Sequence, residues 1–320
     1  MSDLTEYIKN RFGVGEDIFL QAIKISPSSR GYIMGAISEL FLADYLKEKG
    51  FEVLRIKEKP KGGNNAKSSE ARGDFYIRPA GSKDDKWLVI ESKGLKSNSE
   101  FRGDKLNSPD KLFRFLKAIL SLNKNKTRTY DNGLRSYKRI KAFWQSKNRG
   151  KSFPKFNWNK GFPGPIASDL SKVWSSENDL KKWVNSLPVE LFTEAAYRKV
   201  EGAIAILETH QPSTRVAPIT GLKQAAPLVS DFNIMAVDLF LRTGNHEFVF
   251  MNSTEISHSP TSPEHLYQNY IIDILVKDKK EALVINRPWY RDIADCIKMT
   301  SPQYRLIDKS QLDNREVEPM

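Results

Sequence analysis

The 320-residue sequence predicts an α/β protein with a mixed sheet. Residues 31–50, GYIMGAISELFLADYLKEKG, have the apolar spacing of a helix that ends at Gly50. Four apolar side chains set this spacing: Ile33, Ile37, Leu40 and Phe41. The next segment, FEVLRIK, has the composition of a strand. Residues 73–94, GDFYIRPAGSKDDKWLVIESKG, then alternate like two short strands joined by a polar turn.

The remaining elements follow from the same signals. One short helix is predicted to end near Gly13, and EDIFLQAIKI forms a second. Ser108 and Pro109 are the N-cap and first residue of a helix in SPDKLFRFLKAILSL, and a shorter helix runs through DLSKVWSSENDLKKWVNSL. The strands GAIAILE, FNIMAVDLFLRTG and HEFVFMN follow, with a helix predicted in SPEHLYQNYIIDILV at 262–276.

Composition excludes several classes of protein. With 39% hydrophobic and 28% charged residues, the chain has the composition of a globular protein. Its first residues are polar and its apolar runs are short, so we expect neither a signal peptide nor a membrane span. Cys296 is the only cysteine, which excludes an internal disulfide and favours a reducing, cytoplasmic compartment. The helical pattern of RDIADCIKM predicts that Cys296 packs in the core rather than acting as a nucleophile.

The net charge of +12 is concentrated in the first part of the chain. Of the 51 Lys/Arg and 39 Asp/Glu, residues 201–320 contain 12 and 16, which leaves 39 and 23 for residues 1–200. Such asymmetry indicates an N-terminal region that binds a polyanion. We therefore expect nucleic acid as the partner of residues 1–195, and an α+β region at 196–320 for specificity or dimerisation.

The hairpin in residues 73–94 has an unusual arrangement of charge. If its turn spans residues 79–86, Arg78 faces Trp87 and the same register brings Asp74 opposite Glu91. Facing side chains have Cβ atoms roughly 5 Å apart, where like charges are destabilising. Lys93 shares a face with Glu91. A divalent cation such as Mg²⁺ would relieve the repulsion; the alternative is an ordinary edge hairpin whose charges face water.

The order helix, strand, loop, strand, strand, helix over roughly residues 30–122 resembles the PD-(D/E)XK nuclease superfamily, the fold of many type II restriction endonucleases. That family presents an Asp and then [Asp/Glu]-x-Lys on a core hairpin, often with a helical Glu upstream. The matching residues are Asp74, Glu91-Ser92-Lys93 and Glu39, and Gly73 stands in place of the family's Pro. The resemblance implies a restriction-endonuclease-like core (αβββα with a mixed central sheet).

The resemblance also implies roles for these residues. Asp74 and Glu91 would hold Mg²⁺ with an oxygen of the scissile phosphate, and Lys93 would position the attacking water and offset charge on the phosphate. Glu39 remains open between a third carboxylate at the site and a helix-surface charge near Lys47. The products would carry 5′-phosphate and 3′-hydroxyl ends.

Two segments are candidates for gripping DNA. Residues 124–160 contain 12 Lys/Arg, one acidic residue and seven aromatic residues, and residues 58–72 form a basic loop close to Asp74. The candidate contacts are Lys59, Lys61, Lys67 and Arg72 in the loop, and Arg135, Lys138, Arg139 and Lys141 in the longer segment. The aromatic residues of the longer segment are expected to pack in a small core.

The sequence contains no motif that would bind zinc or a nucleotide cofactor. The four histidines lack zinc-ligand spacing, and neither a Walker A sequence nor G-x-G-x-x-G occurs, so we expect no nucleotide cofactor. The sequence therefore predicts a Mg²⁺-dependent endodeoxyribonuclease for double-stranded DNA, a type II restriction enzyme that acts as a homodimer. The alternatives are a repair or junction-resolving nuclease and a noncatalytic DNA-binding protein.

Overall fold

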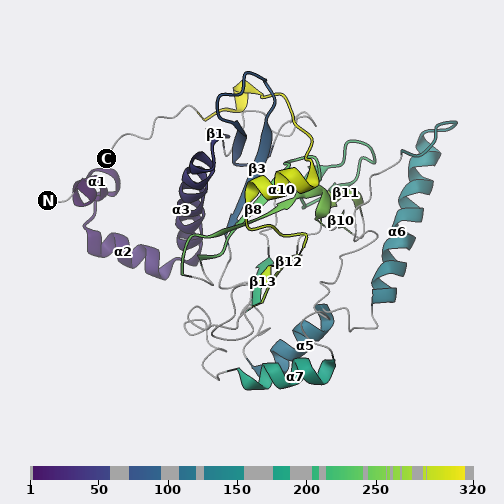
Figure 1. Cartoon of the computed structure of the whole chain (residues 1–320), viewed down its shortest axis with the longest axis horizontal. Coiled ribbons are helices and arrows are strands. Elements are labelled where there is room, and N and C mark those ends of the chain that lie inside the picture. Colours follow the sequence, from purple (N-terminus) through teal and green to yellow (C-terminus); the bar gives the residue numbers. More distant parts are fainter. Residues whose placement is uncertain are drawn as a thin grey trace.

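A five-stranded mixed sheet forms the centre of the protein (Figure 1). The structure is a computed structural model that describes residues 3–57, 72–94, 108–119, 126–154, 176–187, 204–208, 214–240, 244–256, 258–259, 262–266, 269–275, 284–285 and 287–313. The strands lie in the order β1-β2-β3-β8-β9, and only the β3–β8 pair is parallel. Their bounds are β1 Phe51–Arg55, β2 Phe75–Pro79, β3 Leu88–Gly94, β8 Ile234–Asp238 and β9 Phe248–Asn252. The protein is thus mixed α/β, as the sequence predicts.

The register of the β2–β3 hairpin is the one expected from its turn. Phe75 pairs with Ile90 and Ile77 with Leu88. One step further in the same register places Asp74 opposite Glu91. The predicted register is therefore confirmed. Both faces of these strands are buried, and the length of the turn determines which residues face each other.

Helices α3 (Pro27–Glu48) and α10 (Ile293–Thr300) cover one face of the sheet. Leu42 and Leu46 of α3 are fully buried there, as are Ile293 and Cys296 of α10. The predicted packing of Cys296 is confirmed, and burial raises the pKa of its thiol to about 12. Helix α3 begins four residues earlier than predicted, because Ser26 caps it and Pro27 occupies its first turn.

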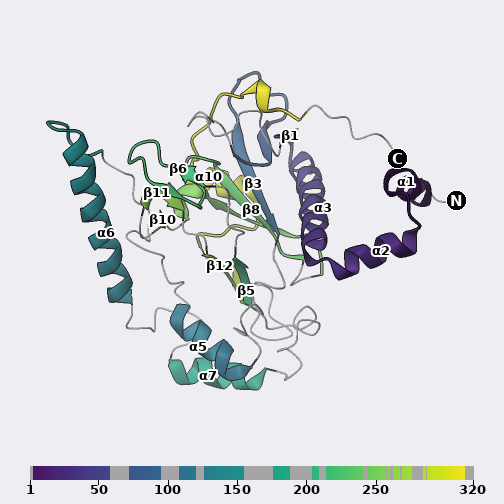
Figure 2. The ribbon, with the colours of Figure 1, turned by 180° about the vertical axis from the view of Figure 1, so that it is seen from behind.

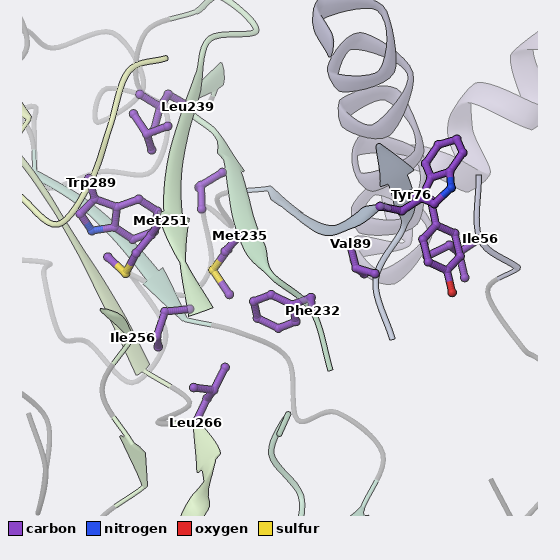
Figure 3. Packing of buried hydrophobic residues seen from close by; sticks show 13 residues of the cluster. Ile56, Tyr76, Val89, Phe232, Met235, Leu239, Met251, Ile256, Leu266 and Trp289 are labelled. Carbon is purple, nitrogen blue, oxygen red and sulfur yellow. The ribbon is translucent and has the colours of Figure 1, made fainter. Parts of the chain in front are cut away.

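The opposite face is covered by segments from the C-terminal half of the chain. Figure 3 shows this cluster, in which Met251 lies beside Trp289 and Tyr76 beside Ile56. Its side chains come from residues 54 to 312, so the cluster joins distant parts of the sequence. The chain described here also contains no helix that is both long and apolar enough to cross a membrane.

Further helices and small sheets surround this centre. The helices are α1 (Asp3–Phe12), α2 (Glu16–Ile25), α5 (Pro109–Ile119), α6 (Lys126–Lys147) and α7 (Glu177–Ser186), with the 3-10 turns η3 (Ser253–Glu255) and η4 (Lys309–Gln311). The strands are β5 (Ile204–Glu208), β6 (Arg215–Val216), β7 (Lys223–Gln224), β10 (His258–Ser259), β11 (Ser262–Leu266), β12 (Asn269–Leu275) and β13 (Val284–Ile285). They form the sheets β6–β7, β10–β11 and β13-β12-β5.

The helix predicted at residues 262–276 is wrong, because this segment contains strands β11 and β12. Long-range contacts decide its conformation. The Glu264 carboxylate accepts hydrogen bonds from the main chain of Ile219 and Thr220. Strand β12 pairs with β5 and β13. Apart from β13, these partners lie more than forty residues away in the chain, and such distant partners leave no local signal in the sequence.

The central sheet crosses the boundary that the change in charge suggests near residue 195. Strands β1, β2 and β3 precede this point, whereas β8 and β9 follow it and continue the same sheet. Helix α10 also follows it and packs on the same face as α3. The change in charge therefore does not coincide with a break in the core.

Candidate active site

Asp74 is fixed by the strands on both of its sides. Its carbonyl oxygen accepts a hydrogen bond from the Ile56 amide at 2.9 Å, and its own amide donates to the Ile90 carbonyl at 2.8 Å. The Ser92 amide donates to Asp74 Oδ2 at 2.6 Å. These bonds direct the Asp74 carboxylate toward β3, the strand that contains Glu91.

Gly73 permits this close approach of the two strands. A Cβ atom at this position would lie 2.5 Å from Val89 Cγ1 and 2.6 Å from the Ile90 carbonyl oxygen. Any side chain would therefore push β2 away from β3 and displace Asp74. This steric requirement explains why glycine precedes Asp74, and no local pattern in the sequence indicates it.

Glu91 and Lys93 lie on the same face of β3 and form an ion pair. The Glu91 side chain is only 16% exposed. Burial raises the pKa of Glu91 to about 7; the nearby Lys93 opposes this shift, and the Asp74 charge adds to it. Asp74 and Glu91 thus repel one another at a largely buried position where little water screens their charges, as their register predicts.

Lys93 remains protonated at neutral pH. Burial alone would lower its pKa, but the charges of Glu91 and Asp74 hold the pKa above its ordinary value. The ammonium group of Lys93 is thus a fixed positive charge beside two carboxylates. An ammonium in this state can donate hydrogen bonds to an anion, but it cannot accept a proton.

Glu39 approaches the same cluster from helix α3. Its carboxylate pairs with the guanidinium of Arg55 on β1, whereas Lys47 pairs with Asp44. Glu39 also contributes to the raised pKa of Lys93, so its charge acts within the cluster. The structure therefore brings Glu39 to the edge of the site, where Arg55 already compensates it.

Asp231 is a further carboxylate near the site that the sequence did not reveal. It is buried, accepts a hydrogen bond from the Leu228 amide at 2.9 Å and pairs with Arg215. Its charge adds to the raised pKa of Glu91. Asp231 lies in the segment that leads into β8, which becomes the neighbour of β3 only in the folded protein.

A histidine is held at the end of the strands that adjoin Lys93. Asp238 of β8 pairs in register with Gly94, and its Oδ2 lies 2.6 Å from His246 Nδ1. The imidazole stacks between Phe41 and Phe240, with ring centroids 4.1 and 4.5 Å away. These contacts tie the end of β8 to α3, the helix of Glu39.

The pair of opposed carboxylates suits a magnesium ion. Mg²⁺ is usually bound by one or two carboxylates together with water and phosphate oxygens, so Asp74 and Glu91 can supply its protein ligands. The repulsion between them also favours a cation. Among the residues that the structure describes, no cluster of three or more His, Cys, Asp or Glu is arranged to hold a metal. Water and phosphate oxygens of a substrate could supply the remaining ligands of Mg²⁺.

The predicted DNA contacts fall in separate places. Lys59, Lys61 and Lys67 lie outside the described residues, whereas the Arg72 amide donates to the Asp231 carbonyl beside the site. The other four are exposed on α6: Arg135, Lys138, Arg139 and Lys141. In Figures 1 and 2, α6 stands at one end of the molecule, apart from β2 and β3.

The aromatic residues of α6 pack against the segment that follows it. Tyr137 and Trp144 both make edge-to-face contacts with Phe153, and Ile140 between them is buried. The residues expected to form this core are Phe143, Trp144, Phe156 and Trp158. Trp144 packs as expected, Phe143 is exposed against the expectation, and Phe156 and Trp158 lie outside the described residues.

Comparison of the chain with protein-family models, curated proteins and solved structures finds no match.

Proposed function

We propose that the protein is a Mg²⁺-dependent endodeoxyribonuclease that hydrolyses phosphodiester bonds in double-stranded DNA. The observation that carries this proposal is the meeting of Asp74, Glu91 and Lys93 on one face of β2 and β3. Two opposed carboxylates next to a lysine provide the charges that phosphoryl chemistry requires. A purely structural hairpin gains nothing from the repulsion between Asp74 and Glu91.

The order of elements supports the same proposal. Helix α3, strands β1 to β3 and helix α5 follow one another as in the core of the PD-(D/E)XK nucleases, and Glu39 occupies the helix before the first strand. The basic charge of residues 1–200 suits a DNA substrate. Within this class we propose a type II restriction enzyme.

Each residue has a distinct part in the proposed reaction. Asp74 and Glu91 would hold Mg²⁺, which supplies charge to polarise the phosphate and lower the pKa of a coordinated water. Lys93 stays protonated, so it would donate to the phosphate and offset the charge that develops in the transition state. Ser92 keeps Asp74 turned toward Glu91 through its amide.

Asp74→Asn tests the site directly. The substitution keeps the shape of the side chain, removes a negative charge and leaves a poorer metal ligand. It should abolish cleavage of phage DNA in Mg²⁺ and tighten DNA binding in EDTA, because one charge that repels the phosphate is lost. Ca²⁺ should tighten binding by the wild type more than by the variant. Filter binding and gel assays measure these effects.

Asp84→Asn is the matched control, since Asp84 lies exposed in the turn of the same hairpin. It makes the same change of charge and should leave cleavage and both affinities unchanged. Lys93→Ala should also abolish cleavage. Cutting by Asp74→Asn, or equal EDTA affinities for Asp74→Asn and Asp84→Asn, would contradict the proposed site. A shifted but uncut wild-type substrate would instead favour a noncatalytic DNA-binding protein.

A further inference from the structure

The first three helices expose an unusual amount of apolar surface. Of the 16 large hydrophobic side chains that are exposed in the described chain, ten lie between residues 4 and 41. We refer to these ten as the N-terminal apolar surface: Leu4, Tyr7, Phe12, Ile18, Leu20, Ile25, Tyr32, Ile33, Leu40 and Phe41. In Figure 1, α1 and α2 extend from the body of the molecule at the end opposite α6.

Helix α3 is apolar on two opposite faces. Leu42 and Leu46 pack on the sheet, while Ile33 and Leu40 share the outward face at helical spacing. From residue 31 to residue 43, Glu39 is the only charged residue. A helix that is apolar on all sides is normally buried on all sides, so α3 requires a cover that the described chain does not supply.

Helix α2 has the same requirement. None of its ten residues is buried, although six of them are large and apolar or alanine. Its Phe19 contacts Phe12 of α1 with ring centroids 5.0 Å apart, and this pair holds the two helices together. Helices α1 and α2 thus expose apolar side chains while this aromatic contact holds the two helices in place.

The size of the surface matches a protein–protein contact. Ten large side chains that each expose about half of roughly 150–200 Å² present on the order of 700–1,000 Å². The largest apolar patch on a typical monomer is about 300–600 Å², whereas a stable interface buries about 800 Å² on each partner. The N-terminal apolar surface is therefore large enough for a stable dimer.

Its charge argues against nucleic acid or lipid as the partner. Residues 3–25 contain three Lys/Arg and four Asp/Glu, although the first 200 residues are strongly basic overall. An anionic membrane or a DNA backbone would require basic residues around the apolar side chains. A nearly neutral apolar surface suits another protein surface of the same kind.

We propose that the N-terminal apolar surface is the contact between two copies of this chain. Glu16 and Asp17 lie in the first turn of α2 and Lys24 in its last turn, so two antiparallel copies of α2 bring opposite charges together. A two-fold axis pairs a surface with itself, and only one such surface is needed. This inference does not depend on the proposed nuclease activity, and its test requires no DNA.

The mass of the full chain in solution tests the proposal. Light scattering after gel filtration at micromolar concentration should give twice the chain mass of 36.6 kDa. The double substitution Ile25→Glu/Tyr32→Glu should give the single-chain mass, because it buries four charges in each dimer. Ile25 and Tyr32 are 78% and 81% exposed, so the substitutions should leave each chain folded. The double variant should keep the circular dichroism of the wild-type chain and a cooperative melt.

Leu306→Glu is the control, since Leu306 is 76% exposed but lies outside this surface. It should remain a dimer. A monomeric wild type at every concentration, or a folded double variant that remains dimeric, would overturn the proposal. So would a monomeric wild type whose binding to DNA or to anionic vesicles is lost in the double variant, because the surface would then serve another partner.

Discussion

Asp74 and Glu91 are brought together by the geometry of two adjacent strands. Their opposition follows from the length of the turn, which is a local feature, so the sequence could predict it. The partner of Glu39 and the position of Asp231 depend on Arg55 and on the β3–β8 pairing. Contacts of this kind join segments far apart in the chain, and no local pattern encodes them.

The raised pKa of Glu91 makes the stability of the metal-free protein depend on pH. Its ordinary value is 4.5 and its value in the folded protein is about 7. Below pH 4.5 Glu91 is protonated in both the folded and unfolded states. As the pH rises from 4.5 through 7, the unfolded state loses its proton more readily, so the folded protein loses stability.

Glu91→Gln should remove this loss. In EDTA the variant should melt at a higher temperature than the wild type at pH 8, and the difference should shrink toward pH 5. Glu48→Gln, at an exposed position near the end of α3, should show no such trend. Thermal melts at several pH values measure the difference. If the difference in melting temperature between Glu91→Gln and the wild type were equal at pH 5 and pH 8, ionisation of Glu91 would not destabilise the folded protein.

At the scale of elements, helix caps and short strands were predictable because their signals are local. Ser108 caps α5 through the Lys111 amide, as its position before Pro109 indicates. The basic segment that becomes α6 has Gly133 and few apolar residues, which hid its helical spacing. The sequence predicts a helix where β11 lies, because Ser-Pro at residues 262–263 resembles a helix start.

The basic residues of helix α6 can be tested for contact with DNA. Replacing Lys138, Arg139 and Lys141 with Ala should weaken DNA affinity and reduce the salt dependence, by a slope of about one for each lost phosphate contact. Because α6 stands apart from β3, the cleavage rate at saturating DNA should not change. Binding measured over a range of salt concentrations and single-turnover cleavage provide both values.

A matched triple substitution separates this effect from loss of net charge. Lys181, Lys182 and Lys223 are also exposed, and their replacement with Ala removes the same charge from other elements. The control should change the salt slope less than the α6 variant does. Equal slopes for the wild type and the α6 variant would place these α6 residues away from DNA.

At the scale of the whole molecule, the boundary between the basic and acidic parts of the chain is not a boundary of the hydrophobic core. The basic residues gather before residue 200, yet β8 and β9 complete the sheet that begins with β1. Net charge reports on partners rather than on the fold, so a charge boundary need not be a folding boundary. The distribution of charge therefore predicts a partner, which remains to be tested, and it does not reveal which strands share a core.

A fragment of residues 1–195 should consequently fail to fold. It would lack every residue of β8 and β9, whose side chains are buried in both faces of the sheet. Loss of burial at Ile234, Met235, Val237, Phe250 and Met251 removes about 2 kcal/mol each. The total of about 10 kcal/mol equals the whole stability of a typical domain.

The fragment should show neither near-ultraviolet dichroism nor a cooperative melt, whereas the full chain should show both. Co-expression with residues 196–320 should restore them, because β8 can then pair with β3. A cooperative melt of the fragment alone would instead identify residues 1–195 as an independent folding unit.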